Sequence, residues 1–154
     1  ITMADESIKR IEDIRLGDVL KSLDISNMSD GEPQSLMFES EELNYTETTT
    51  IVTSAQARFV HTIFIFMNQN QRIIQSSNDH HHFIKRNEIH MFKKSEFVEI
   101  GDYLMNENGE YIEIEDISII NNLSSVVYKL DVEDKDVFFA NGILTHNAKE
   151  EPEP

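Results

Sequence analysis

The chain has 154 residues, of which 13 are Lys or Arg and 29 are Asp or Glu, so its formal net charge is -16. That much negative charge disfavours nucleic acids and anionic membrane surfaces as partners, because both carry phosphates. The sequence has no cysteine and no apolar run near the ~20 residues that cross a bilayer, which excludes disulfides, thiolate chemistry and a membrane-spanning helix.

Short segments rich in Thr, Ile, Val and Phe, separated by polar turns, predict a mostly β protein. Near the start, Ile8, Ile11 and Ile14 recur at a spacing of three and precede the run 16–20, which indicates a bend that leads into a strand. The elements expected next are, in chain order, a loop at 25–35, strands at 46–54 and 59–67 on either side of 55–58, and a hairpin turn at 67–71 into a strand at 72–75.

The second half of the chain has the same character. Its expected elements are short strands at 83–85 and 89–92 across 86–88, a turn at 106–110, a strand over 111–119, and strands at 126–132 and 137–140. Residues 17–20 (Gly-Asp-Val-Leu) and 101–104 (Gly-Asp-Tyr-Leu) echo each other, as in an internally duplicated domain. We therefore expect one domain over residues 1–147, followed by a Glu- and Pro-rich flexible tail at 148–154.

The end of the last β-rich run carries two side chains that together can break a peptide bond. The side-chain amide nitrogen of Asn147 can attack the residue's own backbone carbonyl, close a five-membered succinimide and cut the chain before Ala148. The leaving amine needs a proton, and the adjacent His146 can supply it, because an ordinary histidine has a pKa of about 6.5. General acid catalysis of this kind is worth ~10²–10⁴ in rate.

The surrounding residues resemble the C-terminal splicing motif of inteins, which belong to the self-processing Hint domains. Residues 138–147 (Phe-Phe-Ala-Asn-Gly-Ile-Leu-Thr-His-Asn) carry this resemblance. Three more stretches are similar to the other motifs of the family and follow in the family's order, namely 1–18, 74–80 (Ile-Gln-Ser-Ser-Asn-Asp-His) and 97–104. From the first to the last, the matched stretches span residues 1–147.

The resemblance implies an all-β horseshoe, the Hint fold, with pseudo-two-fold internal symmetry and both chain ends in one central site. It also implies that His80 contacts the N-terminal scissile peptide and protonates its nitrogen during an acyl shift, with Ser77 in the place of the motif's Thr. Asn78 or Asp79 would join Ser77 in orienting His80 or in stabilising the oxyanion. The implied chemistry uses no cofactor and no metal.

The two histidines that follow His80 are interpreted differently. His81 and His82 are favoured as the polar end of a strand, with no part in the chemistry. The alternative is that the three consecutive histidines bind a transition metal, although no spacing in the chain has the specificity of a zinc signature.

Three departures from the family bear on activity. The Cys or Ser that opens the N-terminal motif is expected several positions before Ile1, and Ala148, at the splice junction, stands where the family has Cys, Ser or Thr as acyl acceptor. Lys129 and Asp136 occupy positions where the family often has Asp or Cys, and His. Asp136 either takes over part of the role of that His or is an exposed turn acid before Val137.

Three functional interpretations follow. The first is a protein-splicing domain, cytoplasmic or phage- or virus-encoded and intracellular, that acts once on its flanking extein sequences in cis. It would be the C-terminal part of a split intein that needs a complementary N-terminal intein fragment, a trimmed or trapped intein, or a bacterial or phage intein-like domain. The second is a catalytically dead or cleavage-only Hint module that serves as a structural or interaction domain. The third is an acidic β domain that binds a metal through His80, His81, His82 and His90.

Overall fold

The computed structural model describes residues 1–29 and 34–147, so the expected tail at 148–154 and part of the expected loop at 25–35 lie outside the described residues. Within that part the secondary structure is β-strand with three short 3-10 turns, which confirms the all-β prediction, and no helical segment there is long and apolar enough to cross a bilayer. The elements are η1 (Ile11–Asp13), β1 (Val19–Ile25), η2 (Ser35–Met37), β2 (Glu39–Ser40), β3 (Tyr45–Val60), β4 (Ile63–Asn68), β5 (Gln71–Ser76), β6 (His81–Arg86), β7 (Ile89–Lys94), η3 (Ser95–Phe97), β8 (Tyr103–Met105), β9 (Tyr111–Glu113), β10 (Asp116–Ile120), β11 (Ser125–Val132), β12 (Val137–Ala140) and β13 (Ile143–His146).

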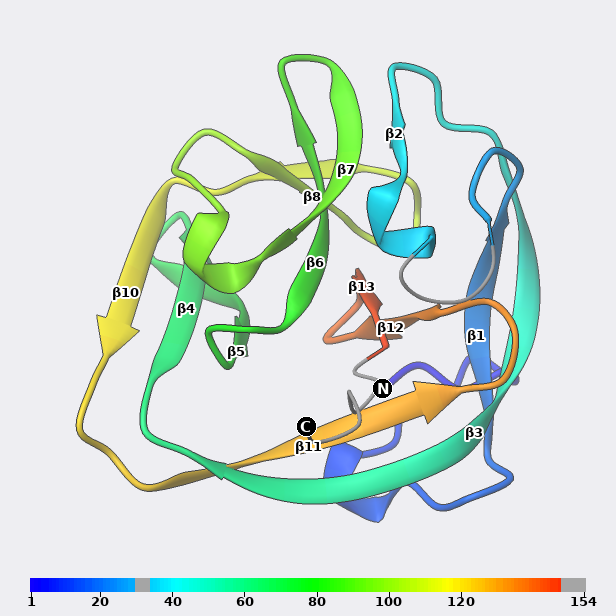
Figure 1. Cartoon of the computed structure of the whole chain (residues 1–154), viewed down its shortest axis with the longest axis horizontal. Coiled ribbons are helices and arrows are strands. Elements are labelled where there is room, and N and C mark those ends of the chain that lie inside the picture. Colours follow the sequence, from blue (N-terminus) through cyan, green and yellow to red (C-terminus); the bar gives the residue numbers. More distant parts are fainter. Residues whose placement is uncertain (30–33, 148–154) are drawn as a thin grey trace.

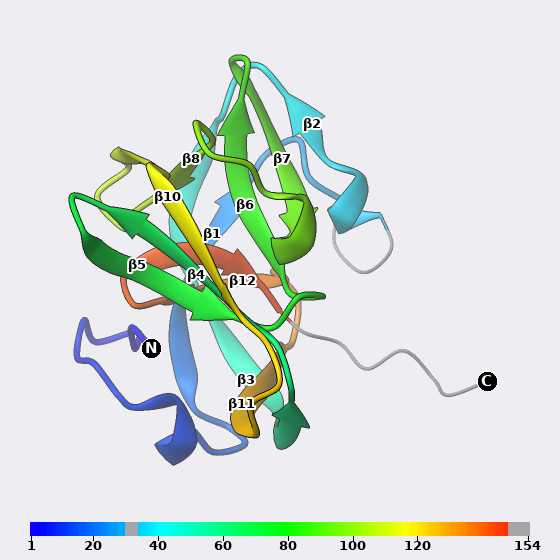
Figure 2. The same cartoon turned by 90° about the vertical axis from the view of Figure 1, so that its left-hand side faces the viewer.

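The strands form three antiparallel sheets around the β12–β13 hairpin. One sheet has the order β1-β3-β11, a second β10-β4-β5, and the third β12-β13-β6-β7-β2 with β8 and β9 attached through β6. In Figure 1, β3 and β11 run together along one side of the molecule, and the β12–β13 hairpin lies between them and β6. Figure 2 shows β4, β5 and β10 grouped as the small second sheet. The hairpin that carries His146 is therefore surrounded by the rest of the fold.

β3 is one strand of 16 residues, where the sequence predicted two strands at 46–54 and 59–67 separated by residues 55–58. The prediction is wrong there because residues 55–58 pair with a distant strand: Ala55 to Val60 lie opposite β11, whereas the first half of β3 pairs with β1. The register between β3 and β11 shifts at Asp131 and Val132, which is a β-bulge. Bulges turn side chains in new directions beside functional sites.

The predicted hairpins are confirmed. Gln69 and Asn70 turn β4 into β5, and Asn87 and Glu88 turn β6 into β7, all four with positive φ as two-residue hairpin turns require. The expected single strand over 111–119 is divided into β9 and β10, because Ile114 is fully buried and bonds back to Asp102 through its backbone.

The echo between residues 17–20 and 101–104 corresponds to the same turn built twice. Gly17 and Gly101 have φ of +88° and +97°, a conformation that glycine adopts without steric cost. In each turn the following aspartate accepts a hydrogen bond from the backbone N–H three residues earlier, Asp18 from Arg15 at 2.9 Å and Asp102 from Glu99 at 2.8 Å. This repetition is the local form of the pseudo-two-fold symmetry that the Hint resemblance implied.

The core consists of three apolar clusters that meet at β12 and β13. Phe139 and Leu144 belong to one cluster, Ile143 to the second and Phe138 to the third, and all four side chains are at most 3% exposed. Burial of such side chains stabilises the fold by about 1.5–3 kcal/mol each. The hairpin therefore packs against all three clusters, and this packing sets the position of Asn147, which follows it.

Candidate active site

The β12–β13 hairpin sets the position of Asn147. Val137 pairs with His146 across the hairpin, and Asn141 and Gly142 form its tip with φ of 52° and 75°. The backbone N–H of Asn147 then donates to the carbonyl oxygen of Asp136 at 2.7 Å, which extends the pairing by one residue. Asn147 is 3% exposed, so the residue predicted as nucleophile is held in the interior.

Two carboxylates hold the side-chain amide of Asn147. Its Nδ2 donates to Oδ1 of Asp131 at 2.9 Å and to Oδ1 of Asp136 at 3.2 Å. Because ionised carboxylates only accept hydrogen bonds, the NH₂ group must face them. Asp136 is 1% exposed with φ of 62°, so the alternative of an exposed turn acid is wrong: it is a turn residue, but a buried one.

His146 contacts the backbone carbonyl that cyclisation of Asn147 would attack. Nδ1 of His146 lies 2.8 Å from the carbonyl oxygen of Asn147, and Nε2 lies 2.8 Å from Oγ of Ser35. The ring is fully buried, with the Phe92 ring 5.0 Å away in an edge-on contact. In this arrangement the histidine polarises the carbonyl and does not lie on the leaving nitrogen at the outset.

His80 reaches the same region from the segment between β5 and β6. Its Nε2 lies 2.7 Å from Oγ1 of Thr145, and Thr145 donates its own hydroxyl hydrogen to the carbonyl oxygen of His81 at 3.1 Å. When the Thr145 hydroxyl donates to that carbonyl, it accepts from Nε2 of His80, and Nδ1 is then the basic nitrogen. Burial lowers the pKa of His80 to about 4, and the His146 and His81 rings act in the same direction. The ring is enclosed although the residue keeps some exposed surface, and it is neutral near pH 7.

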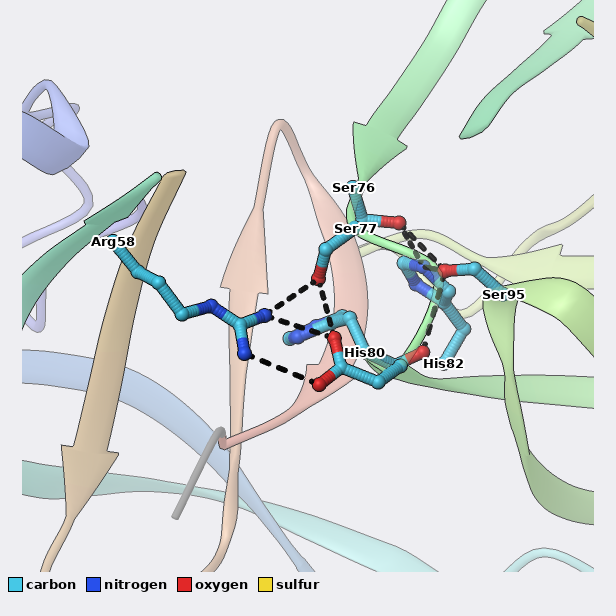
Figure 3. Close-up of polar contacts among 7 residues, drawn as sticks. Arg58, Ser76, Ser77, His80, His82 and Ser95 are labelled. Atoms are coloured by element: carbon cyan, nitrogen blue, oxygen red, sulfur yellow. Dashed lines mark hydrogen bonds and ion pairs between the residues drawn. The ribbon is translucent and has the colours of Figure 1, made fainter. Parts of the chain in front are cut away.

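Ser77 and Asp79 form a separate polar group with Arg58 of β3, shown in Figure 3. Arg58 donates to both carboxylate oxygens of Asp79 (2.9 and 3.3 Å) and to Oγ of Ser77 (3.3 Å), and Ser77 donates to Asp79 at 2.8 Å. Burial alone would raise the pKa of Asp79, but the hydrogen bonds from Arg58 and Ser77 and the charge of Arg58 hold it below its usual range. The three side chains fix the turn that delivers His80.

His81 and His82 are the first residues of β6, which confirms the predicted strand end, but His82 does not lie at the surface. The side chain is fully buried in β6, where Nε2 bonds to Oγ of Ser76 at 2.7 Å and of Ser95 at 3.1 Å (Figure 3). Burial, followed by the charges of His80 and His81, lowers its pKa well below the usual value. Within the described residues no three His, Asp or Glu side chains are arranged to hold a metal ion, so the structure gives no support to the metal-binding interpretation.

A cavity of about 810 Å³ connects these groups. It is lined by His80, Ser77 and Asn147, and also by Ile1 at the amino end of the chain. The backbone N–H of Thr2 donates to the carbonyl oxygen of Phe139 at 3.1 Å, so the first residues run beside β12 as expected. Ile1 and Asn147, near the two ends of the domain, thus border one cavity.

Four residues at this site were not singled out in the sequence, namely Ser35, Arg58, Asp131 and Thr145. Asp131 lies two positions after Lys129 in β11, and residues two apart in a strand point to the same face. The predicted strand therefore already placed Asp131 beside Lys129, which was a usable signal. Thr145 is directly next to the matched His-Asn pair. Arg58 and Ser35 are distant in sequence from the groups they contact, and nothing in the local pattern marks them.

No model of a known protein family and no curated protein matches the sequence. Among solved structures, the chain is similar to the bacterial intein-like domain from Clostridium thermocellum, at 20% identity and a TM-score of 0.67, with 96% of this chain and 93% of that one covered. It is also similar to a DnaB intein from Synechocystis sp. PCC 6803 (13% identity, TM-score 0.62, 97% and 94% covered) and to an inactive variant of the AceL NrdHF class 3 split intein (17%, 0.61, 97% and 94%). The chain adopts the Hint fold of inteins and intein-like domains, as the resemblance predicted.

Proposed function

We propose that this chain is an intein-type autoprocessing domain whose C-terminal reaction is cyclisation of Asn147 with cleavage of the bond to Ala148. The observation that carries the proposal is a convergence on one residue. Asp131 and Asp136 hold the amide nitrogen of Asn147, and His146 holds its carbonyl oxygen. Any buried asparagine needs partners for its amide hydrogens. What supports the proposal is that the amide nitrogen and the backbone carbonyl that it would attack are each held by groups able to exchange protons.

Each of these contacts supplies a group for one step of the reaction. Nδ2 of Asn147 attacks the carbonyl carbon of the same residue and gives one amide hydrogen to a carboxylate of Asp131 or Asp136. The N–H of His146 at Nδ1 stabilises the negative charge that develops on the carbonyl oxygen. When the C–N bond to Ala148 breaks, the departing amine takes up one proton, so the succinimide and the new amino terminus balance the hydrogen that the amide lost.

The cavity and His80 support the preceding acyl shift. A segment that begins with Ser or Cys, joined to Ile1 or supplied as a complementary N-terminal fragment, would enter the cavity that His80, Ser77 and Asn147 border. The Ser or Cys side chain attacks the upstream carbonyl carbon and gives its proton to Nδ1 of neutral His80. His80 passes that proton to the amide nitrogen as the upstream C–N bond breaks, which leaves an ester or thioester and a free amine. Ser77 and Asp79, bound to Arg58, orient His80 at this step. The flanking extein sequences are then the substrate, in cis.

Mass spectrometry of the purified chain tests the C-terminal reaction. Incubation near neutral pH is expected to release the segment 148–154 and leave a chain that ends in a succinimide or asparagine at position 147. Asn147→Ala should abolish the product, because no side-chain nitrogen remains. A wild-type chain that stays intact after prolonged incubation would favour the catalytically dead module instead.

Restoring the ends tests splicing. A lead-in beginning with Ser or Cys before Ile1, combined with Ala148→Ser, should yield ligated flanks, and His80→Ala should stop the first step while Asn147 still cleaves. The reaction is expected to be slow, because Lys129 and Asp136 replace groups that coordinate the two steps in the family. A folded, restored protein that gives neither ligated flanks nor N-terminal cleavage would exclude splicing.

A further inference from the structure

Ser35 is the residue most distant in sequence that contacts the reacting pair. It begins η2, lies 111 positions before His146, and is fully buried. Its Oγ lies 2.8 Å from Nε2 of His146, on the opposite side of the ring from the contact between Nδ1 and the carbonyl oxygen of Asn147. The ring is thus bound at both nitrogens.

The chemistry of the two partners determines where the hydrogen lies. A neutral imidazole has one N–H and one acceptor nitrogen, and a backbone carbonyl oxygen is only an acceptor. At 2.8 Å from that oxygen, Nδ1 of His146 must carry the hydrogen, since two lone pairs would otherwise face each other. Nε2 is then the acceptor, and the hydroxyl of Ser35 must donate to it.

We infer that Ser35 is a positioning residue that fixes the orientation of the His146 ring, so that the hydrogen on Nδ1 faces the carbonyl oxygen of Asn147. The inference rests on the proposed cyclisation of Asn147, since that reaction needs a donor at the carbonyl oxygen. Ser35 does not touch the reacting atoms. The carbonyl oxygen of Asn147 selects the tautomer, and Ser35 supplies the partner that the buried Nε2 then needs.

Hydroxyl rotation gives Ser35 a second use during the reaction. If His146 is protonated at both nitrogens, the same oxygen accepts from Nε2 instead of donating to it. The contact therefore persists in both charge states of the ring. An apolar residue at position 35 would satisfy neither, and a fully buried ring such as His146 has no solvent to replace the contact.

Nitrogen-15 NMR of the intact, labelled chain reads the tautomer directly and independently of cleavage. The wild-type ring of His146 should show a protonated Nδ1 and an unprotonated, hydrogen-bonded Nε2. Ser35→Ala should leave the hydrogen on Nδ1, move the Nε2 resonance to that of a nitrogen without a hydrogen bond, and slow C-terminal cleavage about tenfold, the loss expected for one net hydrogen bond at a buried site. Ser35→Thr retains the hydroxyl and should restore the wild-type Nε2 resonance and rate.

Ser22→Ala is the matched control. Ser22 is also a fully buried serine, and its hydroxyl donates to the carbonyl oxygen of Val137 at 2.7 Å. Its loss should lower stability to a similar degree and leave the Nε2 resonance of His146 unchanged. A wild-type ring already in the Nε2–H form overturns the inference, even if no Ser35 variant folds, and so does an unchanged Nε2 resonance in Ser35→Ala.

The two proposals fail in distinguishable ways. If Ser35→Ala changes the Nε2 resonance but the wild-type chain never cleaves, Ser35 positions His146 and the proposed function is wrong. If the chain cleaves at Asn147 and the Nε2 resonance is insensitive to position 35, the function stands and the role of Ser35 is rejected.

Discussion

The paired carboxylates on Asn147 give a quantitative prediction for the rate of C-terminal cleavage. Asp131→Asn and Asp136→Asn each replace a carboxylate with an amide of nearly the same shape, so the change is mainly one of charge and basicity. Asn suits position 136 especially well, because it tolerates the positive φ of 62° found there. Both variants should fold.

The magnitude follows from the two hydrogen bonds. A hydrogen bond to a charged group contributes about 1.5–3 kcal/mol, and each 1.4 kcal/mol is a factor of ten. Asp131, the nearer carboxylate at 2.9 Å, should therefore slow cleavage at least tenfold when replaced, and Asp136, at 3.2 Å, somewhat less. The double variant loses both carboxylate contacts on the nucleophile, and its cleavage rate should fall by ~10²–10⁴, the usual contribution of a general base.

The assay is the first-order appearance of the cleaved chain by mass spectrometry, with the free energy of unfolding measured in parallel. Asp134→Asn is the control: it removes the same charge from the same segment, but Asp134 contacts Thr50 and not Asn147. A double variant that folds and cleaves within twofold of the wild type would refute the assignment of a base to these carboxylates.

Three further predictions concern stability. The pKa of His80 falls from 6.5 to about 4 on folding, so the unfolded chain binds the proton first as the pH falls. The free energy of unfolding should therefore decrease between about pH 6.5 and pH 4, by at most about 3 kcal/mol. Urea titrations should show a weaker pH dependence of that free energy in His80→Gln, and an unchanged dependence would contradict the neutral ring. Phe139→Ala should cost about 3–5 kcal/mol, whereas Phe59→Ala, at a side chain 72% exposed, should stay within about 0.5 kcal/mol. Gly17→Ala and Gly101→Ala should each cost about 1–2 kcal/mol through their positive φ alone, because an added Cβ meets nothing within 4 Å; unequal losses would argue against equivalent turns.

The sequence predicted the parts of the fold that depend on local pattern. The hairpin turns at Asn70 and Asn87 and the last strands follow from turn chemistry and alternation, and the motif resemblance located His80 and Asn147 at one cavity. The sequence-based prediction failed where pairing with a strand distant in sequence determines the local structure. Residues 55–58 have no strand signal of their own, yet they pair with β11.

The same limit explains the omissions at the site. A buried histidine such as His82 is tolerated because Ser76 and Ser95 form hydrogen bonds with its ring. No sequence pattern identifies these two serines as its partners. Ser35 is an ordinary loop serine until the fold brings it onto His146. Polar networks between distant elements are fixed by tertiary geometry, and the sequence shows only that their members are polar.

Strand β3 is continuous between the residue that contacts the turn before His80 and the residue that lies opposite Asp131, so it fixes the spacing of these two parts of the site. Arg58, which fixes the turn before His80, lies in the same strand as Ser54, the residue opposite Asp131 on β11. Deleting one residue between them would reverse the faces of everything beyond the deletion, so it would disturb the N-terminal and C-terminal centres together. Insertions between positions 54 and 58 should therefore be tolerated less well than insertions in the loops.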